Sequence, residues 1–251
     1  MKTKLTSWPW PRVLAHRCGG ALAPENTLAG LSVAARYGCG VEFDVMLSAD
    51  GTPFVIHDER LERTTSGVGL VAATRDHELE ILDAGVTHHP QFQGEPVPRL
   101  ADLLMRCADL QLAMNLEIKP SAGQDELTAR IVAECLARTG RGRALIVSSF
   151  SEAALEVFAS ALADLPRGLL VESIPPDWLV RCRRLGVCAL HAEASSLTRD
   201  LVQSVRGAGY WLVAYTENSP DRASDLFDWG VDCIITDRPD LINPTSLPPS
   251  A

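Results

Sequence analysis

Residues 41–60 read VEFDVMLSADGTPFVIHDER, which are two apolar runs joined by a short polar turn. Only Met46–Thr52 separate the run Val41–Val45 from the run Pro53–His57. A crossover between parallel strands needs a dozen or more residues, so the second run must return antiparallel to the first. We therefore predict an extra antiparallel hairpin strand over residues 53–57.

Two registers are open for this hairpin. The dipeptide Asp50-Gly51 favours a two-residue turn that places His57 opposite Asp44. A four-residue loop over 48–51 would place His57 opposite Glu42 instead. In either register, the two-residue period of a strand predicts that the two carboxylates and the imidazole share one face.

Outside this hairpin, short apolar runs alternate with stretches that carry apolar residues at helical spacing. The predicted strands are Val13–His16, Val41–Val45, Leu112–Ile118, Ala144–Ser148, Gly168–Val171, Val187–His191, Trp211–Tyr215 and Cys233–Thr236. The predicted helices are Asn26–Tyr37, Leu127–Thr139, Ser151–Leu162, Trp178–Leu185, Thr198–Ala208 and Asp221–Trp229. This alternation predicts an α/β fold, a (β/α)₈ TIM barrel with parallel strands.

We predict a single domain over residues 1–251, with a small insertion at about residues 59–100 that is too long for an ordinary loop. A doubly wound dinucleotide-binding sheet is disfavoured, because no Gly-x-Gly-x-x-Gly turn follows the first predicted strand.

The formal net charge of −9 provides no overall positive field for nucleic acid or an anionic membrane. The seven cysteines are scattered without a Cys-x-x-Cys pair, as in reduced cytosolic proteins. Neither a signal peptide nor an integral membrane segment is readable, so we expect a cytoplasmic protein. The sequence does not specify its oligomeric state.

In a barrel of this kind, residues at the carboxyl ends of the strands meet at one mouth. Glu42, Asp44 and Glu117 are such residues, and their carboxylates are hard oxygen ligands. They predict a site for one divalent cation, either Mg²⁺ or Ca²⁺.

Histidines and cations are expected at the same mouth. His16 and His57 are predicted as an acid–base pair, since imidazole titrates near neutral pH. Arg17 and Lys119 supply local positive charge for a phosphate. His191 and Tyr215 close two later strands and are expected to face the substrate. Together these residues indicate phosphoryl chemistry, with a structural ion cluster as the alternative.

Six motifs now identify a family that the chain resembles over nearly its whole length, the glycerophosphodiester phosphodiesterases of the bacterial cytosolic type. The combination is specific, although no single motif would be. The motifs are AHRCGGALAPENTLAG (15–30), VEFDVMLSADGTPFVIHDERLERTTSG (41–67), FQGEPVPRLADLL (92–104), NLEIKP (115–120), SSFS (148–151) and GVDCIITDRPDLI (230–242).

The resemblance implies metal-dependent hydrolysis of small glycerophosphodiesters to sn-glycerol 3-phosphate and an alcohol. It assigns the acid–base pair, the metal ligands and the phosphate contacts to the residues named above. It also implies that Glu25 and Asn26 support the site and that the insertion shapes the glycerol pocket. Whether water or the glycerol 2-hydroxyl attacks first, and which histidine is the acid, stay open.

Two positions depart from the family pattern. Cys18 follows Arg17 where the family usually has glycine, so a loop that needs positive φ there must rearrange slightly. Tyr215 stands where many relatives carry Trp, which leaves the preferred alcohol open. Rival functions are a lyase that releases a cyclic phosphate, a non-catalytic metabolite-binding barrel, and a sugar-phosphate isomerase that shares only the fold.

Overall fold

The computed structural model of the protein describes residues 7–140 and 144–245. Strand β1 (Val13–Ala15) pairs with β2 (Gly40–Leu47) and thereby closes a ring of eight parallel strands, in the order β1-β9-β8-β7-β6-β5-β4-β2. The other ring strands are β4 (Met114–Ile118), β5 (Leu145–Ser149), β6 (Arg167–Val171), β7 (Ala189–Glu193), β8 (Trp211–Tyr215) and β9 (Cys233–Thr236). The predicted TIM barrel is confirmed.

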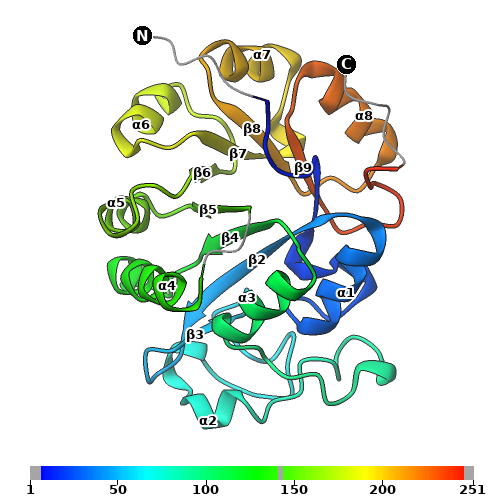
Figure 1. Ribbon diagram of the computed structural model, residues 1–251, viewed down its shortest axis with the longest axis vertical. Helices are drawn as coiled ribbons and strands as arrows, with labels where there is room; N and C mark the ends of the chain where they lie inside the picture. Colours follow the sequence, from blue (N-terminus) through cyan, green and yellow to red (C-terminus); the bar gives the residue numbers. More distant parts are fainter. Residues whose placement is uncertain (1–6, 141–143, 246–251) are drawn as a thin grey trace.

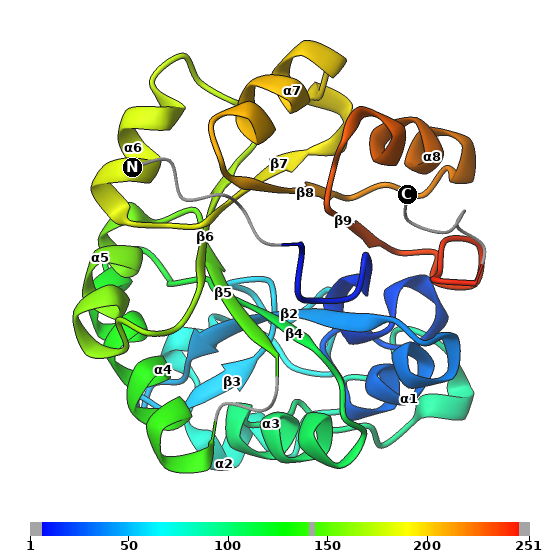
Figure 2. The ribbon, with the colours of Figure 1, turned by 45° about the horizontal axis from the view of Figure 1, so that its top comes forward.

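Helices surround the ring on its outside (Figure 2). They are α1 (Leu28–Tyr37), α3 (Leu100–Asp109), α4 (Asp125–Thr139), α5 (Glu152–Ala161), α6 (Trp178–Leu185), α7 (Arg199–Gly207) and α8 (Pro220–Trp229). All eight predicted strands and six predicted helices are present, with ends displaced by at most two residues. Helix α3 was not predicted, because it directly follows the segment assigned to the insertion.

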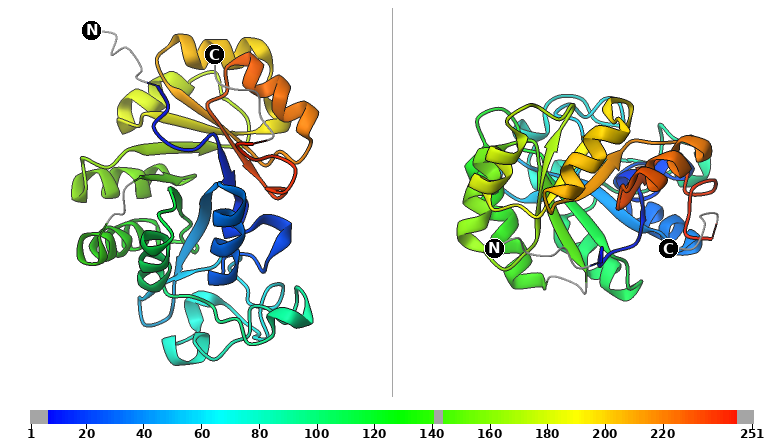
Figure 3. Two further views of the ribbon diagram at one scale, coloured as in Figure 1. Left: turned by 45° about the vertical axis from the view of Figure 1, so that its right-hand side comes forward. Right: turned by 90° about the horizontal axis from the view of Figure 1, so that it is seen from above.

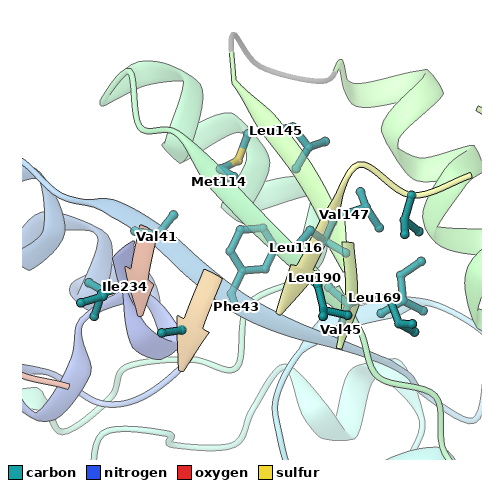
Figure 4. Packing of buried hydrophobic residues seen from close by; sticks show 14 of the residues in the cluster. Val41, Phe43, Val45, Met114, Leu116, Leu145, Val147, Leu169, Leu190 and Ile234 are labelled. Carbon is teal, nitrogen blue, oxygen red and sulfur yellow. The ribbon is translucent and has the colours of Figure 1, made fainter. Parts of the chain in front are cut away.

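Side chains along β2 and β4 point alternately out toward the helices and into the barrel, so apolar core residues and polar residues of the site lie on opposite faces of these strands. Val41, Phe43 and Val45 of β2 point outward into the main apolar cluster beneath the helices, together with Met114 and Leu116 of β4 (Figure 4). The residues between them must therefore point into the barrel. This geometry directs the polar side chains of β2 and β4 toward the barrel interior.

Aromatic rings cover the amino-terminal end of the barrel. The ring of Trp8 lies 4.6 Å from that of Trp10 and 5.5 Å from that of Trp211, the first residue of β8. These rings pack against Ile146 and Ala189, which lie near the starts of β5 and β7. The amino-terminal end is therefore covered, and an active site is expected at the opposite end, where the strands have their carboxyl ends.

The insertion, residues 59–99, lies between β3 (Pro53–Val55) and α3 and contains the short helix α2 (Asp76–Leu79). It extends beyond β2 and β3 at the end of the molecule away from β7–β9 (Figures 1 and 3). A separate apolar cluster holds it against the hairpin, formed by Met46, Phe54, Ile56, Leu61, Val71, Leu79, Ala84 and Val97. Within residues 7–140 and 144–245, no helix is both long and apolar enough to cross a bilayer.

Candidate active site

Three buried carboxylates form the centre of the site. Glu42 and Asp44 alternate on β2 and face the barrel interior, and Glu117 of β4 pairs in register with Asp44. Each offers one oxygen, and these atoms all lie within 4.8 Å of one another. The three residues are 3%, 2% and 8% exposed. The fold thus brings the predicted ligand set together.

Mutual repulsion and burial act on these carboxyl groups. Burial raises the pKa of Glu42 to about 8, and the charge of Asp44 adds to the rise. Burial and Asp44 likewise raise the pKa of Glu117 to about 8. Burial also opposes ionisation of Asp44, but the positive charges that His57, when protonated, and Lys119 place beside it outweigh burial and lower its pKa. A divalent cation among the three would remove this repulsion.

The loop after β1 holds two of these carboxylates. Asn26 Nδ2 donates to Asp44 Oδ2 at 2.9 Å, and Asp44 N donates to Asn26 Oδ1 at 3.2 Å. The backbone N of Arg17 donates to Glu42 Oε2 at 2.9 Å. Asn26 has a φ of 59°, a left-handed conformation that Asn tolerates better than most residues. Asn26 therefore holds Asp44 through two hydrogen bonds, and its role in supporting the site stays a prediction.

His16 follows β1 directly and lies between two carboxylates. Its Nδ1 lies 2.7 Å from Asp237 Oδ1, and its Nε2 lies 4.0 Å from Glu42 Oε2. Asn218 Nδ2 in turn donates to Asp237 Oδ2 at 2.9 Å. Burial lowers the pKa of His16, but the hydrogen bond with Asp237 and the charge of Glu42 outweigh burial and raise it above the ordinary value.

His57 lies between a carboxylate and an ammonium group. Its Nδ1 is 2.6 Å from Asp58 Oδ1, and its Nε2 is 2.5 Å from Lys119 Nζ. The same ammonium lies 3.9 Å from Asp44 Oδ1, so His57 borders the carboxylate cluster. Burial lowers the pKa of His57, although the charge of Asp44 opposes the shift.

Both predicted hairpin registers are wrong. β2 and β3 are antiparallel as predicted, but Val45 pairs with Val55 and Ser48 N donates to Thr52 O, which leaves the three-residue loop 49–51. Strand β3 ends at Val55 instead of residue 57. Alternation therefore does not set the direction of His57, which reaches the site because the chain leaves the ladder just before it.

The guanidinium group of Arg17 is hydrogen-bonded to Glu25 on one side, and on the other its Nε lies 4.0 Å from Asp44 Oδ2. Its Nη1 donates to both oxygens of Glu25, at 3.1 and 3.0 Å. Its Nε is buried and has no hydrogen-bond partner among the described residues. Arg63 from the insertion donates to the same two oxygens of Glu25, at 2.6 and 2.8 Å. Glu25 thus links the loop after β1 to the insertion.

A cavity of about 510 Å³ opens beside His16 and Arg17. Its wall comes from the loop after β1, from the insertion and from the residue that follows β9. Its lining residues are His16, Arg17, Gly20, Ala21, Ala23, Pro24, Glu25, Arg63, Thr64, Ala84, Thr87, His88 and Asp237. None of the three carboxylates lines the cavity, which reaches their cluster through His16 and Arg17, the two lining residues that contact Glu42.

His191 and Tyr215, which were expected to face the substrate, lie outside the lining of this cavity. His191 is fully buried inside the barrel against Gly168, and its two ring nitrogens have no hydrogen-bond partner among the described residues. Burial lowers its pKa to about 3, so the ring is neutral. Tyr215 Oη donates to Val171 O at 3.0 Å, and its ring meets that of Phe150 edge-on at 6.1 Å. Neither residue lines the cavity.

Cys18 adopts the backbone conformation that glycine favours. Its φ is 75°, and its side chain is fully buried. Gly30 makes room for it, since a Cβ at residue 30 would lie 2.8 Å from the Cβ of Cys18. The cysteine itself therefore takes the positive φ at this position.

Three charged residues outside the predicted set of site residues contact members of that set. Asp58 and Asp237 each contact a ring nitrogen of a predicted catalytic histidine, and Arg63 contacts both Asp58 and Glu25. Asp237 directly follows β9 and Asp58 adjoins His57, so position alone could have indicated these two. Arg63 lies in the insertion and has no local spacing signal.

Comparison with known proteins gives consistent results. A glycerophosphodiester phosphodiesterase of Caldanaerobacter subterraneus subsp. tengcongensis is 32% identical over 238 residues, covering 92% of this chain and 96% of that protein. The solved structure of an Oleispira antarctica phosphodiesterase, in complex with the product sn-glycerol-3-phosphate, is 37% identical with a TM-score of 0.88, covering 92% of this chain and 94% of that one.

A third similar protein is the glycerophosphodiester phosphodiesterase from Agrobacterium tumefaciens, whose solved structure is 30% identical with a TM-score of 0.77. The alignment covers 92% of this chain and 98% of that one. The sequence profile described as the Glycerophosphoryl diester phosphodiesterase family matches residues 16–241. The protein therefore belongs to the glycerophosphoryl diester phosphodiesterase family.

Proposed function

We propose that the protein hydrolyses glycerophosphodiesters to sn-glycerol 3-phosphate and an alcohol with the help of one divalent cation. The observation that carries the proposal is the convergence of a three-carboxylate cluster with two histidines, an arginine and a lysine at one barrel mouth. The 37% identical relative solved with sn-glycerol-3-phosphate supports the identity of the product.

The cation would be held by Glu42, Asp44 and Glu117. Their spacing and burial fit this role, because three buried carboxylates within 4.8 Å need a compensating charge. Oxygen-only ligands suit Mg²⁺ or Ca²⁺. When bound, such an ion would offset the charge of the phosphate oxygens and favour attack at phosphorus.

Arg17 and Lys119 would bind the phosphate. The buried, unpartnered Nε of Arg17 is a donor that a phosphate oxygen can satisfy. Lys119 supplies a second positive charge beside Asp44. Glu25 and Asn26 would position Arg17 and Asp44 respectively. Tyr215 would form part of the mouth's wall, whereas the buried His191 can act on substrate only through residues above it.

Hydrogen-bond partners suggest the roles of the histidines. An ammonium group only donates, so His57 Nε2 beside Lys119 accepts and the ring is neutral, as a general base must be. Both nitrogens of His16 instead face carboxylates, which favours the protonated ring of a general acid. His57 would then take a proton from the nucleophile, and His16 would protonate the departing alkoxide.

The proposal includes a cytoplasmic location for a single-domain enzyme acting on small molecules. Its seven cysteines are free thiols, which is typical of the cytosol. The net charge of −9 argues against nucleic acid as a partner.

The test measures release of sn-glycerol 3-phosphate from glycerophosphocholine, glycerophosphoethanolamine and glycerophosphoglycerol. We expect release that EDTA abolishes and that Mg²⁺ or Ca²⁺ restores, which also identifies the preferred ion. His16→Ala should remove activity, whereas His77→Ala, at an exposed histidine of the insertion, should not. Release that survives both EDTA and His16→Ala would refute the assigned site. Accumulation of a cyclic phosphate without sn-glycerol 3-phosphate in ³¹P NMR would establish a lyase instead.

A further inference from the structure

One guanidinium group joins the surroundings of a predicted catalytic histidine to those of the predicted phosphate-binding arginine. Arg63 Nη2 donates to Asp58 Oδ1 at 3.0 Å, and its Nε donates to Asp58 Oδ2. Its Nη1 and Nη2 donate to Glu25 at 2.8 and 2.6 Å. Two carboxylates are therefore gripped by two hydrogen bonds each, the geometry for which arginine is suited.

Each of these carboxylates has a second partner inside the site. Asp58 Oδ1 lies 2.6 Å from Nδ1 of His57, and Glu25 accepts two hydrogen bonds from Arg17. The chain of contacts runs from His57 through Asp58, Arg63 and Glu25 to Arg17. No other arginine or lysine among the described residues contacts both carboxylates.

Stability alone does not account for this arrangement. The Arg63 side chain is 49% exposed, and ion pairs at such exposure add little to folding stability. Arg60, three residues earlier and 62% exposed, forms an ion pair with Glu62 only and does not reach the site. The two arginines share a segment and a similar exposure but differ in what they contact.

We propose that Arg63 is a positioning residue that aligns His57 with Arg17 by fixing Asp58 and Glu25 together. The inference rests on the proposed function. Without Arg63, Glu25 would retain only Arg17 as a partner and would draw its guanidinium away from the phosphate. Asp58 would lose its anchor, so the ring of His57 would no longer be held in one orientation.

The first test compares Arg63→Ala, Arg63→Lys and the matched control Arg60→Ala. We expect Arg63→Ala to lower kcat and to raise KM, with kcat/KM reduced between about tenfold and a hundredfold, as misplacement of reacting groups produces. Arg63→Lys keeps the charge but not the four-bond grip, so it should recover only part of the loss. Arg60→Ala should match the wild type, and all variants should melt at the wild-type temperature.

A double-mutant cycle tests whether Arg63 affects activity through Asp58 and Glu25. Asp58→Asn and Glu25→Gln, each combined with Arg63→Ala, should cost less than the sum of the single changes, because the residues act as one unit. Additive losses, or an Arg63→Ala enzyme with wild-type kcat and KM, would overturn the positioning role.

Two readouts do not need turnover. Inorganic phosphate should bind more weakly to Arg63→Ala than to Arg60→Ala in calorimetry, and the NMR signal of the His57 Nδ1 proton should shift or broaden only in Arg63→Ala. Unchanged phosphate affinity together with an unchanged His57 signal would reject the inference. A wild-type protein that releases no sn-glycerol 3-phosphate would reject the proposed function while these two readouts still decide the role of Arg63.

Discussion

Asn26 and Asp44 are joined by two hydrogen bonds, one through each polar atom of the Asn26 amide group. The pair connects the loop after β1 with β2, and Asn26 makes it from a left-handed backbone. A carboxylate held in this way presents its oxygens to a metal in one fixed direction.

Asn26→Gly should weaken metal binding without straining the backbone, because glycine tolerates the φ of 59° at this residue. Loss of a group that orients a metal ligand typically costs about 10- to 100-fold in affinity. Calorimetric titration with Mg²⁺ and Ca²⁺ measures the change. Affinity equal to that of the wild type would show that Asp44 needs no such support.

The two histidine roles can be separated by changing the leaving group. A p-nitrophenyl ester of glycerol 3-phosphate releases a phenolate that departs without protonation. If His16 is the acid, His16→Ala should be much less damaging with this ester than with glycerophosphocholine, measured as kcat. His57→Ala should be damaging with both substrates, because a base is still required. The reverse pattern would exchange the two roles.

At Cys18, substitution by glycine should leave the protein more stable than substitution by alanine, which is the reverse of the usual order. The left-handed conformation costs a non-glycine residue roughly 1–2 kcal/mol, a cost that Cys18→Ala retains and Cys18→Gly removes. We therefore expect Cys18→Gly to have the higher free energy of unfolding in urea. Cys107, buried in α3, is the control: there glycine should be worse than alanine by about 1 kcal/mol. If the alanine variant were the more stable one at both residues, the left-handed backbone of Cys18 would not be costing stability.

The raised pKa of Asp232 should make the stability of the protein depend on pH. Burial raises its pKa to about 6, above the value of about 3.9 expected in the unfolded chain. The folded protein thus binds this proton more tightly, and the carboxyl group lowers the free energy of unfolding as pH rises from about 4 to 6. Asp232→Asn lacks this titration and can still accept the hydrogen bond from Leu212 N.

The stability of Asp232→Asn relative to the wild type should therefore increase by roughly 1–3 kcal/mol between pH 4 and pH 7. Urea unfolding at both pH values measures the difference. A difference that stays constant or falls would show that the ion pair with Arg206 offsets the effect of burial.

Most of the barrel was predictable, because its strands and helices carry local apolar patterns that the fold retains. Helix α1 begins after the predicted Asn26, since that residue's left-handed backbone excludes it from a helix. The hairpin register failed because the loop has three residues, a length between the two considered.

Much of the site could be predicted for a different reason, since carboxyl ends of parallel strands converge wherever a barrel closes. This rule indicated the three carboxylates and His16. It could not indicate Arg63, whose partner Glu25 is 38 residues away, because an ion pair between two loops leaves no periodic trace in the sequence.

The residues proposed to react or to bind metal and phosphate all lie on β2 and β4 or shortly after β1, β3 and β4, so the last of them is Lys119. The strands from β5 onward complete the ring and bring Phe150 and Tyr215 into edge-on contact. The proposed reacting groups are thus encoded in the first half of the gene, and only the Asn218–Asp237 support of His16 comes from the end of it. Directed evolution should be able to randomise the loops after β5 to β7 and leave the reacting groups untouched, whereas the loop after β8 carries Asn218, which supports His16 through Asp237, and should be kept.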